Sequence, residues 1–212
     1  MPRSQNPLMH TFEALMAWDA VDTSGREARA AARKLLGFVS SLGGFASGAL
    51  IEDFSPAWEP LPVERGGVVN LGHAFEWAWL LSEWHKLTGD VEALRVGGLF
   101  LRTGVQWGLD ADGGVRAACA PDGRITSADK HLWPQCEAVR ALRRYVATHG
   151  QTEWEDALQR ALAFYRQHFV DEEFGGVFAV PPGLGPLPRL DKGDAWKLDY
   201  HTLGMCLEFI RG

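Results

Sequence analysis

The chain has 212 residues, of which 46% are hydrophobic, and its nine tryptophans help to supply a sizeable buried core for one domain. Lysine and arginine total 21 against 27 acidic residues, giving a net charge of −6, and no basic cluster gathers in one segment. This charge distribution argues against a protein that binds the phosphate backbone of nucleic acids.

No segment of the sequence has the composition of a membrane span. Apolar runs stay well below the roughly 20 residues that a span requires, and the first residues, MPRSQNPLMH, lack the apolar part of a signal peptide. We therefore expect a cytoplasmic protein without a membrane partner. Cys119, Cys136 and Cys206 are far apart and show no CxxC spacing, so we expect buried free thiols rather than a disulfide framework or a zinc site.

Hydrophobic residues recur at helical spacing in seven stretches of the chain. Stop signals separate them: Gly43-Gly44 ends the second, Thr88-Gly89-Asp90 follows the third, and His149-Gly150 follows the fifth. The sequence therefore predicts an all-α protein with helices over 7–20, 25–42, 70–88, 91–108, 132–149, 151–169 and 196–211.

The connections between these helices alternate in length. Within a pair they are short, TGD and HGQ, as antiparallel neighbours require. Between pairs they are about 25 residues long and contain a Gly-Gly, a short apolar stretch and a turn, in SLGGFASGALIED, DADGGVRAACAPDGR and DEEFGGVFAVPPGLG. This pattern predicts one small β-hairpin used three times.

A histidine lies at or near the start of every second helix. These histidines are His10, His73, His131 and His201, and their successive spacings are 63, 58 and 70 residues. Helix pairs repeated at a period near 60 imply stacked units, in an open solenoid or a closed toroid.

The helices are of two kinds. Residues 71–81 are apolar on every side, whereas 92–107 and 153–169 carry charge on one face. We expect the first kind to form an inner layer and the second kind an outer layer. An α/α toroid of this design gathers the histidines at one rim, where helix N-termini also direct amide hydrogens toward bound oxygens.

Four stretches, QNPLMHTFEAL, NLGHAFEWAWLL, DKHLWPQCEAVRAL and WKLDYHTLGMCLE, resemble the N-acylglucosamine 2-epimerase family in order and spacing. The family includes mannose isomerase, cellobiose 2-epimerase and sulfoquinovose isomerase relatives. The resemblance implies an (α/α)₆ barrel of twelve helices and chemistry at C1 and C2 of a reducing mono- or disaccharide. It implies no redox cofactor and no obligatory metal.

The resemblance also implies roles for individual residues. His73 and His201 match the two histidines that act as acid and base on the sugar, and Glu76 matches the carboxylate that accompanies the first of them. Free histidine, with a pKa of about 6.5, can take or give a proton near neutrality. Glu76, one helical turn after His73, could bond its other ring nitrogen or a sugar hydroxyl.

Four further residues are expected to bind the substrate. His10 matches another pocket histidine, and Trp196 and Trp133 look like aromatics that stack on the sugar. Glu13 follows His10 by three residues, the spacing of His73 and Glu76, although a carboxylate there could instead serve the helix dipole.

The remaining histidines have ordinary structural explanations. His131 starts a helix without an acid on its own stripe, and we expect it to be structural. His85, His149 and His168 lie late in their helices, where a cation near the last carbonyls is common. The two His-x-x-Glu pairs begin different helices and add no cysteine or aspartate cluster, so we predict no metal.

The chain departs from the family in length. Twelve helices at this period need about 360 to 400 residues, so 1–212 is expected to form a single partial barrel, matching the C-terminal part of the family. The family's pocket arginine has no counterpart in the matched segments.

Two functions stay open from the residues. The chain is a sugar epimerase or isomerase, or it is an inactive fragment or sugar-binding half-barrel that needs a partner. That partner would be a second copy or a complementary N-terminal half, since an open toroid exposes apolar helix flanks. A glycoside hydrolase would require two carboxylates around a glycosidic oxygen, whereas the rim motifs offer histidines.

Overall fold

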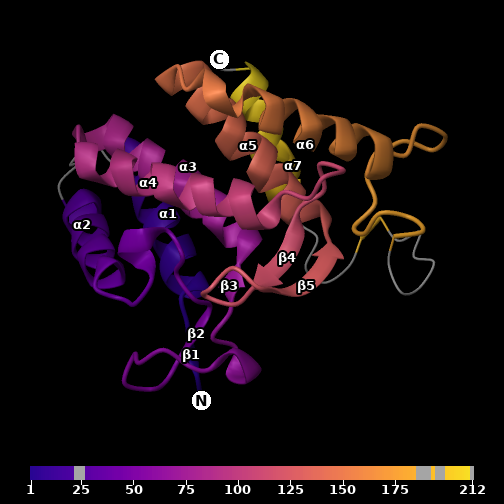
Figure 1. The fold of residues 1–212 in the computed structure, drawn as a ribbon. Helices are drawn as coiled ribbons and strands as arrows, with labels where there is room; N and C mark the ends of the chain where they lie inside the picture. Colours follow the sequence, from indigo (N-terminus) through magenta and orange to yellow (C-terminus); the bar gives the residue numbers. More distant parts are fainter. Residues whose placement is uncertain (22–26, 185–191, 194–198, 211–212) are drawn as a thin grey trace.

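The computed structural model describes residues 1–21, 27–184, 192–193 and 199–210, and it is built mainly of α-helices (Figure 1). Seven α-helices lie in these ranges, close to the seven that hydrophobic periodicity predicts. They are α1 (Asn6–Val21), α2 (Glu27–Ser40), α3 (Leu71–Thr88), α4 (Val91–Thr103), α5 (Leu132–His149), α6 (Glu155–His168) and α7 (Asp199–Ile210).

The helices form two layers, as the sequence predicts. The inner helices α1, α3, α5 and α7 pack side by side in chain order, and each of α2, α4 and α6 packs on the outside of the inner helix before it. α3 is buried along its length, from Leu71 to Trp84. In contrast, α2 buries only Ala28, Ala32, Leu36 and Val39, which lie on one stripe. The described helices make an open arc of an α/α toroid.

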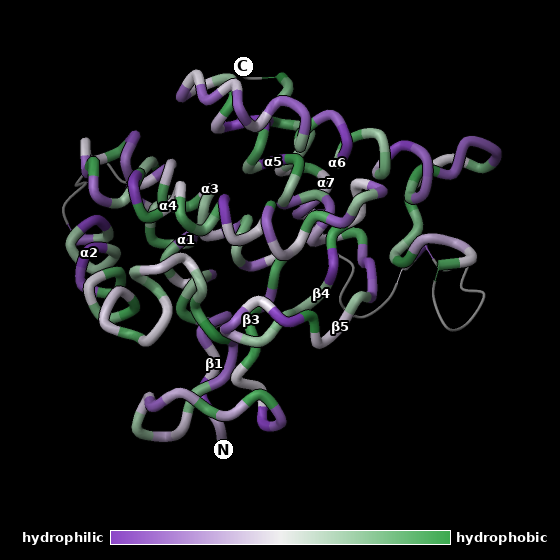
Figure 2. Tube along the Cα trace, in the orientation of Figure 1, coloured by the Kyte–Doolittle hydropathy of each residue, from purple (hydrophilic) through white to green (hydrophobic). Residues whose placement is uncertain are grey.

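Figure 2 shows the same distinction in hydropathy, because hydrophobic and hydrophilic residues alternate along α2 and α6. In α6 the buried residues are Ala157, Leu158, Ala161, Phe164 and Tyr165, at the three- and four-residue spacing of one helix face. The outer helices therefore bury one face against the inner layer and leave the other in contact with water.

Local signals set the ends of the helices around the site. The Asn70 side chain accepts hydrogen bonds from the backbone N–H groups of Gly72 and His73 and so caps the start of α3. Gly89 ends the helix at φ 76°, and Asp90 then caps α4 through the N–H groups of Glu92 and Ala93. This two-residue link makes α3 and α4 antiparallel neighbours.

A π-helix, η3 (Gly104–Gly108), continues α4, and three short 3₁₀ helices lie at Phe45–Ser47 (η1), Val63–Arg65 (η2) and Thr152–Trp154 (η4). The strands are short. β1 (Arg3–Ser4) pairs with β2 (Asp53–Phe54), and β3 (Val69–Asn70), β4 (Arg116–Cys119) and β5 (Ile125–Lys130) form a three-stranded antiparallel sheet.

Among the described residues, the predicted hairpin forms with two full strands in one of the three long connections. β4 and β5 are that hairpin, and in the third connection a single bridge joins Val170 to Val177. In the first connection a single bridge likewise joins Phe54 to Pro60. There Gly44 and Gly48, at φ 92° and 76°, turn the chain into a 3₁₀ helix against the backbone of α4, and β2 pairs instead with the N-terminal strand.

Two other expectations have clear outcomes. Cys119 and Cys136 are buried cysteines, but Cys206 is exposed, so the prediction of burial is wrong for that residue. Its position on α7 explains this, since Met205 and Glu208 are the buried residues of that helix. In the described part of the chain, no helix combines the length and the apolar character that crossing a membrane requires.

Candidate active site

The first turns of the inner helices bring the predicted histidines together around one aromatic ring. His73 lies in the first turn of α3, Trp133 in the first turn of α5 and His201 in the first turn of α7. The Trp133 ring centroid is 5.1 Å from that of His73 and 5.5 Å from that of His201. Helices distant in the sequence thus present two imidazoles to one apolar surface.

His73 is held by a carboxylate that the sequence reasoning missed. Its Nδ1 lies 2.7 Å from Oε2 of Glu52, which also accepts hydrogen bonds from the Ser4 hydroxyl and the Gln5 amide. Burial alone would raise the pKa of Glu52, but the hydrogen bond and charge of His73, together with Ser4 and Gln5, lower it to about 2. Glu52 is therefore ionised.

This contact corrects one expectation for Glu76. Glu76 was a candidate partner for a ring nitrogen of His73, but no hydrogen bond joins the two side chains. Glu52 instead bonds Nδ1 of His73. The reason is geometric: Glu76 lies one turn further along α3 and is directed toward α1, where His10 Nδ1 is 3.7 Å from its Oε1.

His201 has an equivalent arrangement. Its Nδ1 lies 2.8 Å from Oε1 of Glu137, a fully buried residue of α5, and Arg140 bonds the other oxygen of Glu137 at 3.2 Å. Each of the two histidines thus directs Nδ1 at a carboxylate. The Nε2 atoms are the ring nitrogens left to meet a ligand.

Glu76 is wholly buried, and neither of its oxygens has a hydrogen-bond partner among the described residues. Burial raises its pKa well above the ordinary value, and the charges of Glu137 and Glu13 raise it further, while Arg140 and the Tyr200 hydroxyl oppose the shift. The carboxyl group therefore stays protonated to higher pH than an ordinary glutamate, and in that form it can donate a proton or a hydrogen bond.

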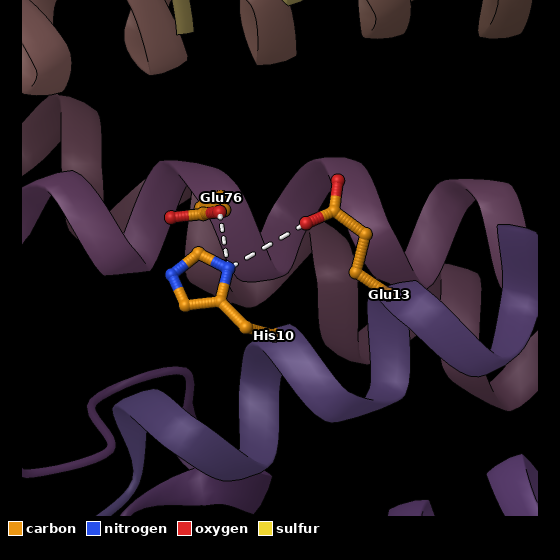
Figure 3. A group of neighbouring side chains, drawn as sticks. All are labelled: His10, Glu13 and Glu76. Atoms are coloured by element: carbon orange, nitrogen blue, oxygen red, sulfur yellow. Dashed lines mark ion pairs between the residues drawn. The ribbon is translucent and has the colours of Figure 1, made fainter. Parts of the chain in front are cut away.

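Glu13 belongs to the same cluster. Figure 3 shows the Glu13 and Glu76 side chains both directed toward His10, and the ring nitrogen Nδ1 lies 3.6 Å from Glu13 Oε2. The Tyr200 hydroxyl donates a hydrogen bond to Glu13. Although burial would raise the pKa of Glu13, the contacts with His10, Tyr200 and Arg140 lower it. Glu13 is thus part of the cluster around His10, and its role in binding the substrate stays a prediction.

Two groups of side chains could hold a cation. Ligand atoms of His10, Glu13 and Glu76 lie within 4.8 Å of one another, as do those of Glu76, Glu137 and His201. Arg140 already supplies positive charge there, 3.2 Å from Glu137 and 3.9 Å from Glu13. This guanidinium offsets part of the negative charge of the cluster, and the absence of a metal stays a prediction.

Four site residues were not found from the sequence: Glu52, Glu137, Arg140 and Tyr200. Glu137 and Arg140 do carry a signal, because a Glu and an Arg three residues apart stand among Cys136, Ala138, Val139 and Ala141, which are all buried on α5. Tyr200 precedes His201 directly in the KLDYHTLG motif. Glu52 gives no such signal, since it lies in a connection 21 residues before its partner.

The remaining histidines have structural positions. His85 and His149 lie at the C-terminal ends of α3 and α5, where His85 contacts the Asp90 carbonyl and His149 the Ser82 hydroxyl. His131 precedes α5 without capping it through its side chain, and His168 ends α6. Trp196, the remaining predicted aromatic, lies outside the described residues.

A family model, related sequences and solved structures all resemble this chain. The family model for N-acylglucosamine 2-epimerase matches residues 1–204. A mannose-6-phosphate isomerase of Rhizobium meliloti is 33% identical over 168 residues, covering 76% of this chain and 42% of that protein. A cellobiose 2-epimerase of Bacteroides fragilis is 31% identical, covering 68% of this chain and 38% of that protein.

A crystal structure of D-mannose isomerase superposes with a TM-score of 0.85 at 26% identity, covering 99% of this chain and 56% of that one. The chain therefore spans about half the length of the proteins it matches. With its two-layered helices and a family match over nearly its whole length, the chain belongs to the N-acylglucosamine 2-epimerase family.

Proposed function

We propose that this chain carries the proton-transfer residues of a sugar isomerase or 2-epimerase acting at C1 and C2 of a reducing mono- or disaccharide. The relatives are named as isomerases of mannose or mannose 6-phosphate and as a cellobiose 2-epimerase, so a reducing sugar is the substrate class. The observation that carries the proposal is the pair His73 and His201, each bonded through Nδ1 to a carboxylate and each beside Trp133.

The chemistry requires a base at the carbon next to the open-chain carbonyl. One imidazole removes the proton from C2, the C–H electrons form a C1=C2 double bond, and the carbonyl oxygen becomes an enediol oxygen that needs a proton or a donor. Nε2 of either histidine suits the first task. The carboxyl group of Glu76 suits the second, because it is buried, its pKa is raised and its oxygens have no hydrogen-bond partner among the described residues.

The product depends on where the proton returns. Delivery to the opposite face of C2 gives the epimer, whereas delivery to C1, with loss of the O2 proton, gives the ketose. Two histidines on different helices, α3 and α7, can serve different faces or atoms of the same intermediate. Trp133 offers the apolar surface on which the C–H face of the sugar would lie, and His10 and Glu13 would bind its hydroxyls.

The second candidate is a sugar-binding half-barrel that is inactive without a partner. Large apolar side chains are exposed on the helices at the two ends of the arc, with Trp18 of α1 63% exposed, and Leu203 and Ile210 of α7 59% and 77% exposed. In a monomer such positions are usually covered when they form a large patch. The cover would be further helices of a longer polypeptide, a second copy, or a complementary chain.

A proton-exchange assay separates the two candidates. The protein is incubated with mannose, N-acetylmannosamine or cellobiose in D₂O, and the H2 signal of the sugar is followed by NMR. We expect deuterium uptake at C2, and His73→Ala and His201→Ala should each abolish it. A matched control is His168→Ala, since His168 lies at the far end of α6. Sugar binding without any exchange at high protein concentration would favour the half-barrel instead.

Cofactor and location remain predictions from the sequence. Because Arg140 already supplies a cation next to Glu137 and Glu13, exchange should persist after dialysis against a chelator. Loss of exchange that Mn²⁺ or Zn²⁺ restores would instead assign a cation to the cluster. The expected cytoplasmic location can be checked by cell fractionation.

A further inference from the structure

We propose that Glu52 is a positioning residue that fixes His73 in the tautomer with the proton on Nδ1, and that the N-terminal strand holds Glu52 for this purpose. The claim about turnover rests on the function proposed above, whereas the claim about the tautomer does not. The distance of 2.7 Å between Glu52 Oε2 and His73 Nδ1 is that of a charge-assisted hydrogen bond.

The other contacts of Glu52 determine which atom carries the hydrogen. The Ser4 hydroxyl donates to Oε1 at 2.7 Å, and the Gln5 amide donates to Oε2 at 3.0 Å. A carboxylate that accepts from these neighbours is ionised and has no proton to give. The hydrogen between Glu52 and His73 must therefore come from Nδ1, which leaves the lone pair on Nε2.

Gln5 allows one competing arrangement. Its Nε2 also lies 2.8 Å from His73 Nδ1, so it could donate to that nitrogen if the imidazole proton were on Nε2. The Trp77 indole donates to Gln5 Oε1 at 2.8 Å and fixes the orientation of the amide. Each arrangement has one unfavourable contact. With the proton on Nδ1, that N–H faces the Gln5 amide nitrogen, another donor, at 2.8 Å. In the competing arrangement the ionised Glu52 faces a nitrogen lone pair at 2.7 Å, and because the carboxylate carries a full charge this repulsion is the larger cost.

The backbone around Glu52 is built to hold this position. β1 pairs with β2 directly beside it, with Ser4 opposite Asp53. The N–H of Gln5 donates to the Glu52 carbonyl, and the Glu52 N–H donates to the Val68 carbonyl. Strand pairing therefore sets the side chains of Ser4 and Gln5 against the same carboxylate. The N-terminal segment thereby helps to orient the imidazole of His73, both through Glu52 and through the contact of Gln5 with Nδ1.

The test reads the tautomer directly. In protein labelled with ¹⁵N-histidine, a long-range ¹H–¹⁵N correlation spectrum distinguishes a protonated ring nitrogen from one with a lone pair, and the His73→Ala spectrum identifies the signals. We expect His73 in the wild-type protein to have its proton on Nδ1. A spectrum with the proton on Nε2 would overturn the proposal, and this measurement needs no folded variant other than the one used for assignment.

The variant Glu52→Gln then tests the effect. Its amide can donate to Nδ1, so we expect the proton to move to Nε2 and kcat for exchange to fall about 10- to 100-fold with little change in KM. Asp53→Asn is the matched control, the acid that follows Glu52 directly and begins β2, and it should leave the tautomer and kcat unchanged. An unaltered tautomer and rate in Glu52→Gln would refute the positioning role. If wild-type protein shows the Nδ1 proton but no exchange with any sugar, the proposed function fails while the tautomer assignment stands.

Discussion

Glu76 links the site to the stability of the protein, because its carboxyl group is wholly buried beside two other carboxylates. Since its pKa is raised in the folded state, the folded protein keeps this proton at pH values where the unfolded chain has released it. Above the ordinary pKa of 4.5 the free energy of unfolding therefore falls as pH rises, until the pKa of the folded state is reached.

The variant Glu76→Gln removes this titration while keeping the shape of the neutral acid. Its melting temperature relative to wild type should therefore increase as the pH rises above about 5, and each unit of pKa shift is worth about 1.4 kcal/mol. Glu13→Gln provides a control of opposite sign. The pKa of Glu13 is lowered, so that side chain stabilises the folded state above pH 4.5 and its loss costs stability there. Parallel pH profiles for the two variants would contradict this account.

At the scale of the helices, Gly72 allows α3 and α5 to approach at the site. A Cβ atom at this position would lie 2.4 Å from the Trp133 ring, closer than real contacts permit. Gly72→Ala must therefore push Trp133 away from His73 and His201. We expect a loss of about 1–3 kcal/mol in the free energy of unfolding, as overpacking usually costs, together with at least about a tenfold fall in kcat/KM.

Gly98 is the matched glycine for this experiment. It lies inside α4, and an added Cβ would meet nothing within 4 Å. Gly98→Ala should therefore stabilise the protein by about 0.5–1 kcal/mol through helix propensity and leave exchange unchanged. Urea unfolding and the exchange assay measure both effects. If the two substitutions shift stability in the same direction, Gly72 does not control the approach of the helices.

The elements differ in how far the sequence predicts them. Helices such as α3 follow from periodicity and caps, because Asn70 and Gly89 act on residues a few positions away. Glu52 could not be predicted, since its role depends on β1 pairing with β2 across about 50 residues and on a contact to α3. The first connection was predicted only in part for a related reason: a Gly-Gly and an apolar stretch describe a turn, but not the strand with which the next residues pair.

On the scale of the whole molecule, the open arc leaves apolar side chains at both of its ends. On α7, Leu203, Phe209 and Ile210 are 59%, 42% and 77% exposed, and Trp18 and Val21 near the end of α1 are 63% and 79% exposed. The chain covers 56% of the D-mannose isomerase structure on which it superposes. In the absence of covering helices, association between copies would remove this surface from water.

We therefore expect this chain to associate with itself in a concentration-dependent way, which sedimentation velocity would measure. The double variant Leu203→Gln, Ile210→Gln should weaken association without lowering the melting temperature, because both side chains are exposed and contribute little to the core. Val91→Gln is the matched control, an exposed apolar residue at the start of the outer helix α4, and should associate like wild type. A chain that stays monomeric at all concentrations would show that the ends of the arc tolerate water. In that case the exchange assay on the monomer would report directly on the site that α1, α3, α5 and α7 assemble.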